Sequence, residues 1–154
     1  MATLNFIGRV NIAVRLVREQ YPNAELYEAQ GYPSKGATSS AGEIDKLRVV
    51  FNVDNGTEMN GTAIIESTGW GEFGAPEYVT EPWLEDCVID WPIEMDLEEA
   101  CKLIQQAGYT QNFMAVTIRY PLYKRSERAY YTFDLSKYLH LLVDTVTNDV
   151  TVRK

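Results

Sequence analysis

The strongest constraint on the fold is a pattern that occurs twice along the chain: an amphipathic helix followed by runs of strand character. The first predicted helix spans about residues 4 to 20, with Thr3 placed to cap it and Pro22 preventing its continuation. The second spans about residues 96 to 108, with Asp96 as its cap and Gly108 as its stop. In both segments apolar residues recur at steps of three and four, which indicates one buried helical face.

The strand-like runs of the two halves can be aligned. "LRVVFNV" (47 to 53) matches "AYYTFDL" (129 to 135), and "AIIES" (63 to 67) matches "LLVDT" (141 to 145). Apolar side chains alternate along these runs and along residues 114 to 120, where Met114, Val116, Ile118 and Tyr120 share a face. One apolar face predicts an α+β fold in which an antiparallel sheet is covered on one side by helices.

We therefore expect a single domain over residues 1 to 154, built from two similar αβββ halves. The halves span about residues 1 to 66 and 96 to 154, and an acidic, tryptophan-rich connection at 67 to 95 joins them. The alternative is a chance similarity between two amphipathic stretches of the same class.

The second half resembles the PepSY module over about residues 96 to 152. "DLEEACKLIQQAGY", "YYTFDL" and "YLHLLVDTVTNDVTV" follow the order of that module, in which a short helix with "EEA" precedes strands ending in V-D-x-x-T-G-x-V. Asn148 replaces the glycine of the pattern, and both residues tolerate left-handed turn geometry. The resemblance implies two PepSY/cystatin-like modules in tandem and a non-enzymatic role in binding or in restraining peptidases.

Charge is distributed in blocks along the chain. The net charge is −8, yet no basic residue lies between Val49 and Cys101, where thirteen acidic residues give −13. The remainder carries +5. Such a segment repels phosphate backbones and attracts basic partners, although it can also serve only to keep the protein soluble.

The connection is the best candidate site. "STGWGEFGAPEYVTEPWLEDCVIDWP" (67 to 92) holds all three tryptophans, and its stretch "DCVIDWPI" is a candidate short strand. Tryptophan among carboxylates can anchor and steer a basic protein, or it can act as a strap over the sheet. A docking surface would leave at least one tryptophan largely exposed. The predicted binding residues are Trp70, Phe73, Tyr78, Trp83, Trp91, Glu72, Glu77, Glu81 and Glu85.

Catalytic and metal-binding motifs are not evident. His140 is the single histidine, "GWGEFG" lacks the lysine of a phosphate-binding loop, and Cys87 and Cys101 have no neighbours in ligand spacing. We expect no metal and no cofactor, and we expect both cysteines to be free thiols. The acidic residues offer many carboxylate pairs, so an enzyme using carboxylates stays open, but the sequence selects no pair.

Basic residues and tyrosines gather in "RYPLYKRSERAYY" (119 to 131). This mixture occurs in nucleic-acid grooves, but the overall acidity opposes that use. Pairing of this hairpin with the acidic segment of the same chain is at least as well supported as nucleic-acid binding.

These observations favour a non-enzymatic protein-binding module, of the inhibitor or immunity type, that acts on a basic partner. The alternatives are a small-ligand-binding protein with an aromatic pocket and the enzyme named above. No run reaches the roughly 18 apolar residues of a membrane span, and the first residues lack a signal-peptide pattern. With Met1 as the natural start, the expected location is the cytoplasm.

Overall fold

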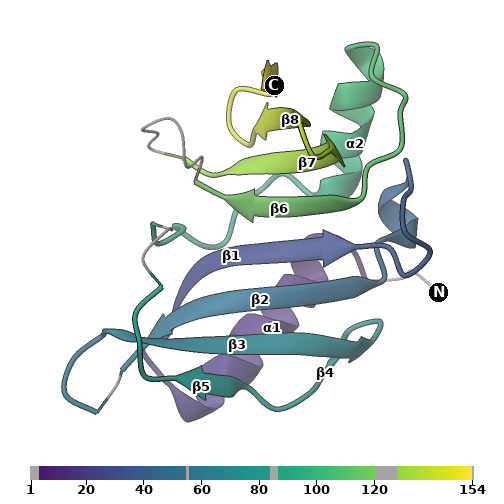
Figure 1. Cartoon of the computed structure of the whole chain (residues 1–154). Coiled ribbons are helices and arrows are strands. Elements are labelled where there is room, and N and C mark those ends of the chain that lie inside the picture. Colours follow the sequence, from purple (N-terminus) through teal and green to yellow (C-terminus); the bar gives the residue numbers. More distant parts are fainter. Residues whose placement is uncertain (1–3, 55, 84–86, 121–127, 154) are drawn as a thin grey trace.

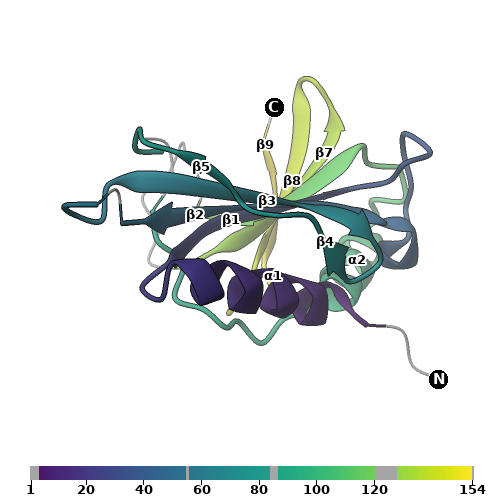
Figure 2. The same cartoon turned by 90° about the horizontal axis from the view of Figure 1, so that it is seen from below.

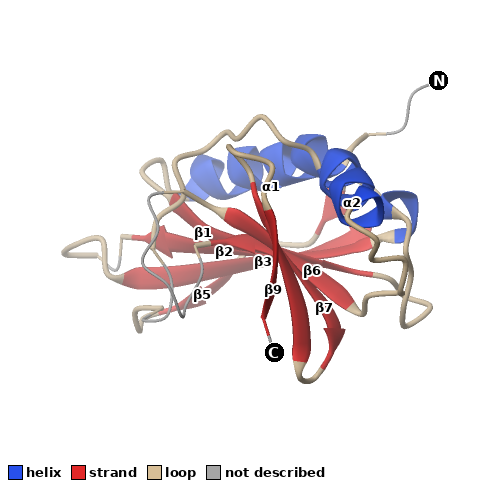
Figure 3. Ribbon diagram, turned by 90° about the horizontal axis from the view of Figure 1, so that it is seen from above, coloured by secondary structure: helices blue, strands red, loops and turns tan. Residues whose placement is uncertain are grey.

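The computed structural model describes residues 4–54, 56–83, 87–120 and 128–153. These residues form one antiparallel sheet of nine strands with two α-helices, so the predicted α+β class is confirmed. Both helices lie on the same face of the sheet, as Figures 2 and 3 show. The opposite face carries no helix in the described part of the chain, and Figure 1 is viewed from that side.

The elements follow one order in each half of the chain. The first half contains α1 (Phe6–Gln20), β1 (Glu25–Tyr32), a short 3-10 turn (Ala41–Glu43), β2 (Lys46–Val53) and β3 (Gly61–Gly69). Two short strands follow, β4 (Glu72–Phe73) and β5 (Glu77–Val79). The second half contains α2 (Leu97–Gln106), β6 (Ala115–Arg119), β7 (Tyr130–Ser136), β8 (Leu139–Asp144) and β9 (Val150–Arg153).

The two halves meet in the middle of the sheet. The strand order is β4-β3-β2-β1-β6-β7-β8-β9, with β5 also paired to β3. β1 pairs with β6 in antiparallel register, with Ala29 opposite Ile118 and Gly31 opposite Val116. One continuous ladder therefore joins residues that are far apart in the sequence, as Figure 1 shows.

The core lies between the helices and the sheet. Alternation along the strands is confirmed in β2, where Leu47, Val49, Phe51 and Val53 are all buried and belong to the core. Met114 does not share the buried face predicted for it, because β6 begins one residue later and Met114 stays 46% exposed. Gly31 allows close packing, since a Cβ atom there would lie 2.5 Å from Ile44.

The helix termini differ in part from the expected caps. Thr3 lies outside the described residues, and Asn5 caps α1 by accepting a hydrogen bond from the Gly8 N–H at 2.7 Å. Asp96 caps α2 as predicted, through the Glu98 N–H at 3.3 Å. Its second carboxylate oxygen accepts the Ile7 N–H of α1 at 2.9 Å, so one side chain caps both helices.

Candidate functional site

The connection between β3 and α2 is bound to the sheet at several points. β4 and β5 pair with β3, and the Thr62 hydroxyl donates to the Glu81 carbonyl at 2.8 Å. Further along, the Ile89 N–H donates to the Leu26 carbonyl at 2.8 Å, and the Tyr131 hydroxyl donates to the Met95 carbonyl at 2.9 Å. The described part of "DCVIDWPI" forms no strand, because Ile89 makes only this isolated backbone bond.

Two of the three tryptophans are held against α1. The Trp70 indole N–H donates to the Leu4 carbonyl at 3.0 Å, and the Arg9 guanidinium lies 3.6 Å from the centre of the Trp70 ring. The Trp91 indole N–H donates to the Asn11 side chain at 2.7 Å. Both rings therefore fasten the connection to the helical layer.

Trp83 lies on the other side of the sheet. Its ring is 5.8 Å from the guanidinium of Arg48, which alternates with the core-facing Leu47 and Val49 and so faces away from the helices. All three tryptophans are half-buried. The structure thus contains neither one exposed tryptophan cluster nor three fully buried rings.

The most exposed aromatic residue of the predicted site is Tyr78. It is 37% exposed and stacks on Tyr21, with 5.9 Å between ring centres and 13° between planes. Phe73 is half-buried and packs against the core. Glu72, Glu77 and Glu81 are exposed, and together with Tyr78 they form what we call the acidic edge. Glu85 lies outside the described residues.

The acidic edge keeps its charge unneutralised within the described part of the chain, where Glu72, Glu77 and Glu81 form no ion pair. The described arginines of the predicted basic hairpin each lie close to a carboxylate of the sheet. Arg119 lies 3.3 Å from Glu28, and Arg128 lies 2.8 Å from Asp144. Glu28 lies in β1 and Asp144 ends β8, and the predicted pairing of this hairpin with the acidic segment stays a prediction. Tyr123, Lys124 and Arg125 lie outside the described residues.

Arg9 is a buried cation that the sequence reasoning did not single out. It is 1% exposed, and its guanidinium donates to the Ile44 carbonyl at 2.7 Å. Burial lowers its pKa to about 10, against the opposing charges of Asp96 and Asp45. Phe6, Arg9, Trp70 and Asp96 line a pocket of about 320 Å³. The sequence position of Arg9 could have indicated its burial, because Arg9 lies one helical turn from both Phe6 and Ala13 in the apolar stripe of the helix.

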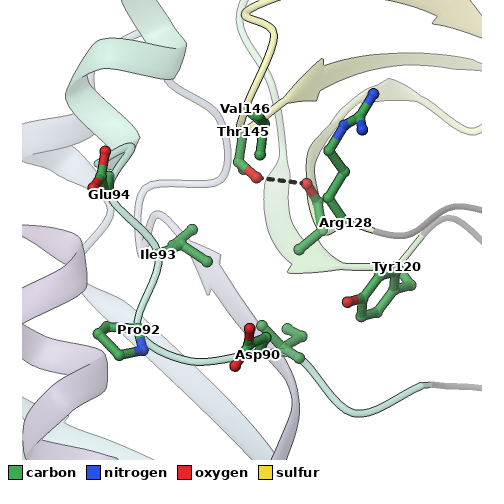
Figure 4. A pocket seen from close by; sticks show the side chains of 10 residues that line it. Asp90, Pro92, Ile93, Glu94, Tyr120, Arg128, Thr145 and Val146 are labelled. Atoms are coloured by element: carbon green, nitrogen blue, oxygen red, sulfur yellow. Dashed lines mark hydrogen bonds between the residues drawn. The ribbon is translucent and has the colours of Figure 1, made fainter.

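A second pocket opens where the connection passes the ends of β6, β7 and β8. We call it the strand-end pocket, and its volume is about 360 Å³. Asp90 and Ile93 of the connection form one wall, and Thr145 and Val146 form the opposite wall, as Figure 4 shows. The Thr145 hydroxyl donates to the Ala129 carbonyl at 2.8 Å, which fixes that wall.

A row of polar side chains crosses the face without helices. Register places Arg119 opposite Tyr130 and Tyr130 opposite Asp144. Burial by itself would raise the pKa of Asp144, but hydrogen bonds from Arg128, the Val146 and Thr147 N–H groups and Tyr130 outweigh it and hold this pKa well below its usual value. The two buried carboxylates among the described residues, Glu28 and Asp144, thus each contact an arginine.

The remaining reactive residues are dispersed. His140 Nδ1 lies 2.7 Å from Asp134 Oδ1 on the face without helices. Cys87 is exposed and Cys101 is buried, and both are free thiols as predicted. Burial raises the pKa of Cys101 to about 12, which suppresses its thiolate. Within the described ranges, no three His, Cys, Asp or Glu side chains are placed to hold a metal ion. Neither described helix is long and apolar enough to cross a membrane.

Comparison with known proteins gives a fold relative and no family. No protein-family model matches the chain, and no curated protein does. Its structure is similar to a crystal structure described as a "putative lipoprotein" from Clostridium difficile 630, with a TM-score of 0.64 and 12% sequence identity. The similarity covers 98% of this chain and 99% of that chain, so the fold is shared over its whole length.

Proposed function

We propose that the protein is a non-enzymatic binding module that docks a basic protein partner on its acidic edge. The observation that carries this proposal is the exposure of Glu72, Glu77 and Glu81 along the sheet edge that also carries Tyr78, with no ion pair for these carboxylates among the described residues. Exposed like charges accelerate encounter with an oppositely charged surface, and an aromatic side chain among them supplies the contact that is kept after docking.

In this proposal two of the tryptophans position the connection, whereas the sequence predicted that they bind the partner. Trp70 and Trp91 hold the connection on α1, so they present the acidic edge rather than contact the partner. Trp83 beside Arg48 marks the face of the sheet without helices. An inhibitor or immunity-type role suits such a surface, since blocking a basic enzyme requires complementary charge and no chemistry.

We also infer that the chain is built from two PepSY-like αβββ modules in tandem. The order α1-β1-β2-β3 matches α2-β6-β7-β8, and the first strands of the two sets pair at the centre of the sheet. A superposition of residues 5 to 66 on 96 to 147 tests the inference. The duplication is wrong if the helix and two strands cannot be aligned.

The relative described as a "putative lipoprotein" favours a cell-envelope location over the cytoplasm. A basic partner would then be an envelope or secreted protein. Fractionation of cells that produce the full-length protein separates the two locations, because an envelope protein follows the membrane or periplasmic fraction.

The test of the function uses the basic proteins encoded beside this chain, each produced with it and purified together. We expect one of them to bind, and Tyr78→Ala to weaken its Kd about 30-fold, or about 2 kcal/mol. Glu77→Gln with Glu81→Gln should slow association several-fold at low salt, and 1 M salt should abolish the difference as the Debye length shrinks to about 3 Å.

The matched control is Glu98→Gln with Glu99→Gln. These residues are exposed, belong to the same acidic segment and change the net charge equally, but they lie on α2, at the far side of the molecule in Figure 1. If both pairs of substitutions slow association equally, net charge alone would explain the effect and the acidic edge would have no specific role. Binding that ignores all three acidic-edge substitutions would refute the proposal.

A further inference from the structure

The strand-end pocket combines apolar wall residues with the carboxylates of Asp90 and Glu94. Ile93 points into the space between the walls in Figure 4, and Val146 lies across from it. Asp90 is exposed and forms no ion pair within the described part of the chain. A long apolar stem with a polar head fits such a site better than a wholly apolar group does.

The sign of the charge in the pocket follows from its neighbours. Arg128 contributes to the lining, but its guanidinium donates to both carboxylate oxygens of Asp144, at 3.0 and 2.8 Å, and is turned away from the pocket in Figure 4. That pair cancels its own charge, whereas Asp90 and Glu94 are both acidic. The pocket therefore attracts a cation and repels an anion.

Tyr120 adds to the same field. Burial raises the pKa of its hydroxyl, and the charges of Asp90 and Cys87 raise it further. The hydroxyl therefore stays protonated and polar at neutral pH, and its oxygen can accept a hydrogen bond from an ammonium or guanidinium head.

Size limits the occupant. A volume of about 360 Å³ lies near the lower end of ligand pockets, which run from about 300 to 1,000 Å³. One long side chain suits this volume better than a nucleotide or a large cofactor. The wall residues from the connection belong to the same acidic segment of the sequence as the acidic edge.

We propose that the strand-end pocket receives one lysine or arginine side chain of the basic protein partner, with the aliphatic stem between Ile93 and Val146 and the charged head at Asp90. This proposal rests on the proposed function, because the basic protein partner supplies the side chain. The recognition chemistry itself is a cationic head on an apolar stem, and it can be tested without the partner.

The experiment uses two small probes and the full chain labelled for NMR. N-acetyl-lysine methylamide has the stem and the ammonium, and N-acetyl-norleucine methylamide has the stem alone. We expect the lysine probe to shift the amide signals of Asp90, Ile93, Ala129 and Thr145 in a saturable way. The norleucine probe should produce markedly weaker shifts.

Variants separate the pocket from general charge attraction. Asp90→Asn should weaken lysine-probe binding about three- to fivefold, whereas Glu72→Gln, which removes an equal charge from the acidic edge, should leave it unchanged. Val146→Trp should block the pocket for both probes, and Val146 is 68% exposed, so the fold tolerates the larger side chain.

The proposal is overturned if neither probe shifts these signals, if norleucine binds as well as lysine, or if Asp90→Asn and Glu72→Gln have the same effect. If the lysine probe binds as expected but Asp90→Asn leaves the affinity for the partner unchanged, the pocket does not receive the partner's side chain. Loss of the acidic-edge effect with an intact lysine-probe response refutes the proposed function alone, so the two failures are distinguishable.

Discussion

The two halves of the molecule share one order of elements but differ in how much sheet their helices cover. α1 has 15 residues and α2 has 10, so at 1.5 Å per residue α1 is about 7.5 Å longer. No residue of α2 lines the strand-end pocket, and residues 89–94 of the connection form its wall instead. In this half, a connecting segment rather than a helix therefore supplies the wall of a cavity.

The largest expected effect tests whether the halves are energetically one unit. Phe51 and Phe133 occupy matching positions in the aligned strands, and both are fully buried. Phe51→Ala and Phe133→Ala should each lower the free energy of unfolding by about 3–5 kcal/mol, because each leaves a cavity in the core. Urea denaturation should give a single transition for both variants. Two separated transitions would show that the halves unfold independently.

The next largest effect compares two aligned carboxylates of the third strands, Asp144 in β8 and Glu66 in β3. Asp144 is 2% exposed and accepts from Arg128, whereas its counterpart Glu66 is exposed and lies 3.8 Å from Arg48. Asp144→Asn should cost about 2–3 kcal/mol at neutral pH, because it weakens a buried charge-assisted network. Glu66→Gln should cost less than about 1 kcal/mol.

The contribution of Asp144 to the free energy of unfolding depends on pH, because the folded protein lowers its pKa. The unfolded chain takes up this proton near the ordinary value of about 3.9, and the folded chain only at lower pH. The stabilisation is therefore complete above about pH 5 and is lost as pH falls through and below 4. Denaturation measured between pH 7 and pH 3 should show that the free energy of unfolding falls less steeply with acidification in Asp144→Asn than in the wild type. Equal slopes would contradict the assignment.

The smallest expected effect concerns the turns that follow the third strands. The first-half turn contains Gly71 at φ +78°, and the second-half turn contains Asn148 at φ 69°. Asn148→Ala should destabilise by about 1 kcal/mol, while Asn148→Gly should lie within about 0.5 kcal/mol of the wild type, because glycine adopts this conformation without strain. Thermal unfolding measures both. A clear loss with glycine would weaken the PepSY resemblance, which places glycine here.

The helices and main strands were predictable because each carries its own periodicity. Asp96 and Gly108 mark the ends of α2 through local chemistry, and the alternation along β2 needs only one buried face. Asn148 likewise adopts the left-handed conformation that its type allows. These features depend on neighbours in the sequence, so a single sequence reveals them.

The candidate site was less predictable because it depends on which face of the sheet the connection crosses. Trp83 lies on one side and Trp70 and Trp91 on the other, although all three belong to one acidic stretch. Composition cannot distinguish these sides. The pocket was also missed, since its walls come from residues 89–94 and 145–146, which meet only after the sheet has formed.

The pairing of β1 with β6 sets an order of events during synthesis. While only the first half has left the ribosome, β1 is an edge strand whose outer N–H and C=O groups face solvent, and such an edge can pair with a neighbouring chain. The Ile7 N–H at the start of α1 also lacks the carboxylate that accepts its hydrogen bond in the folded protein until Asp96 has been translated. We therefore expect nascent chains that stall before β6 to expose a strand edge that can pair with another chain.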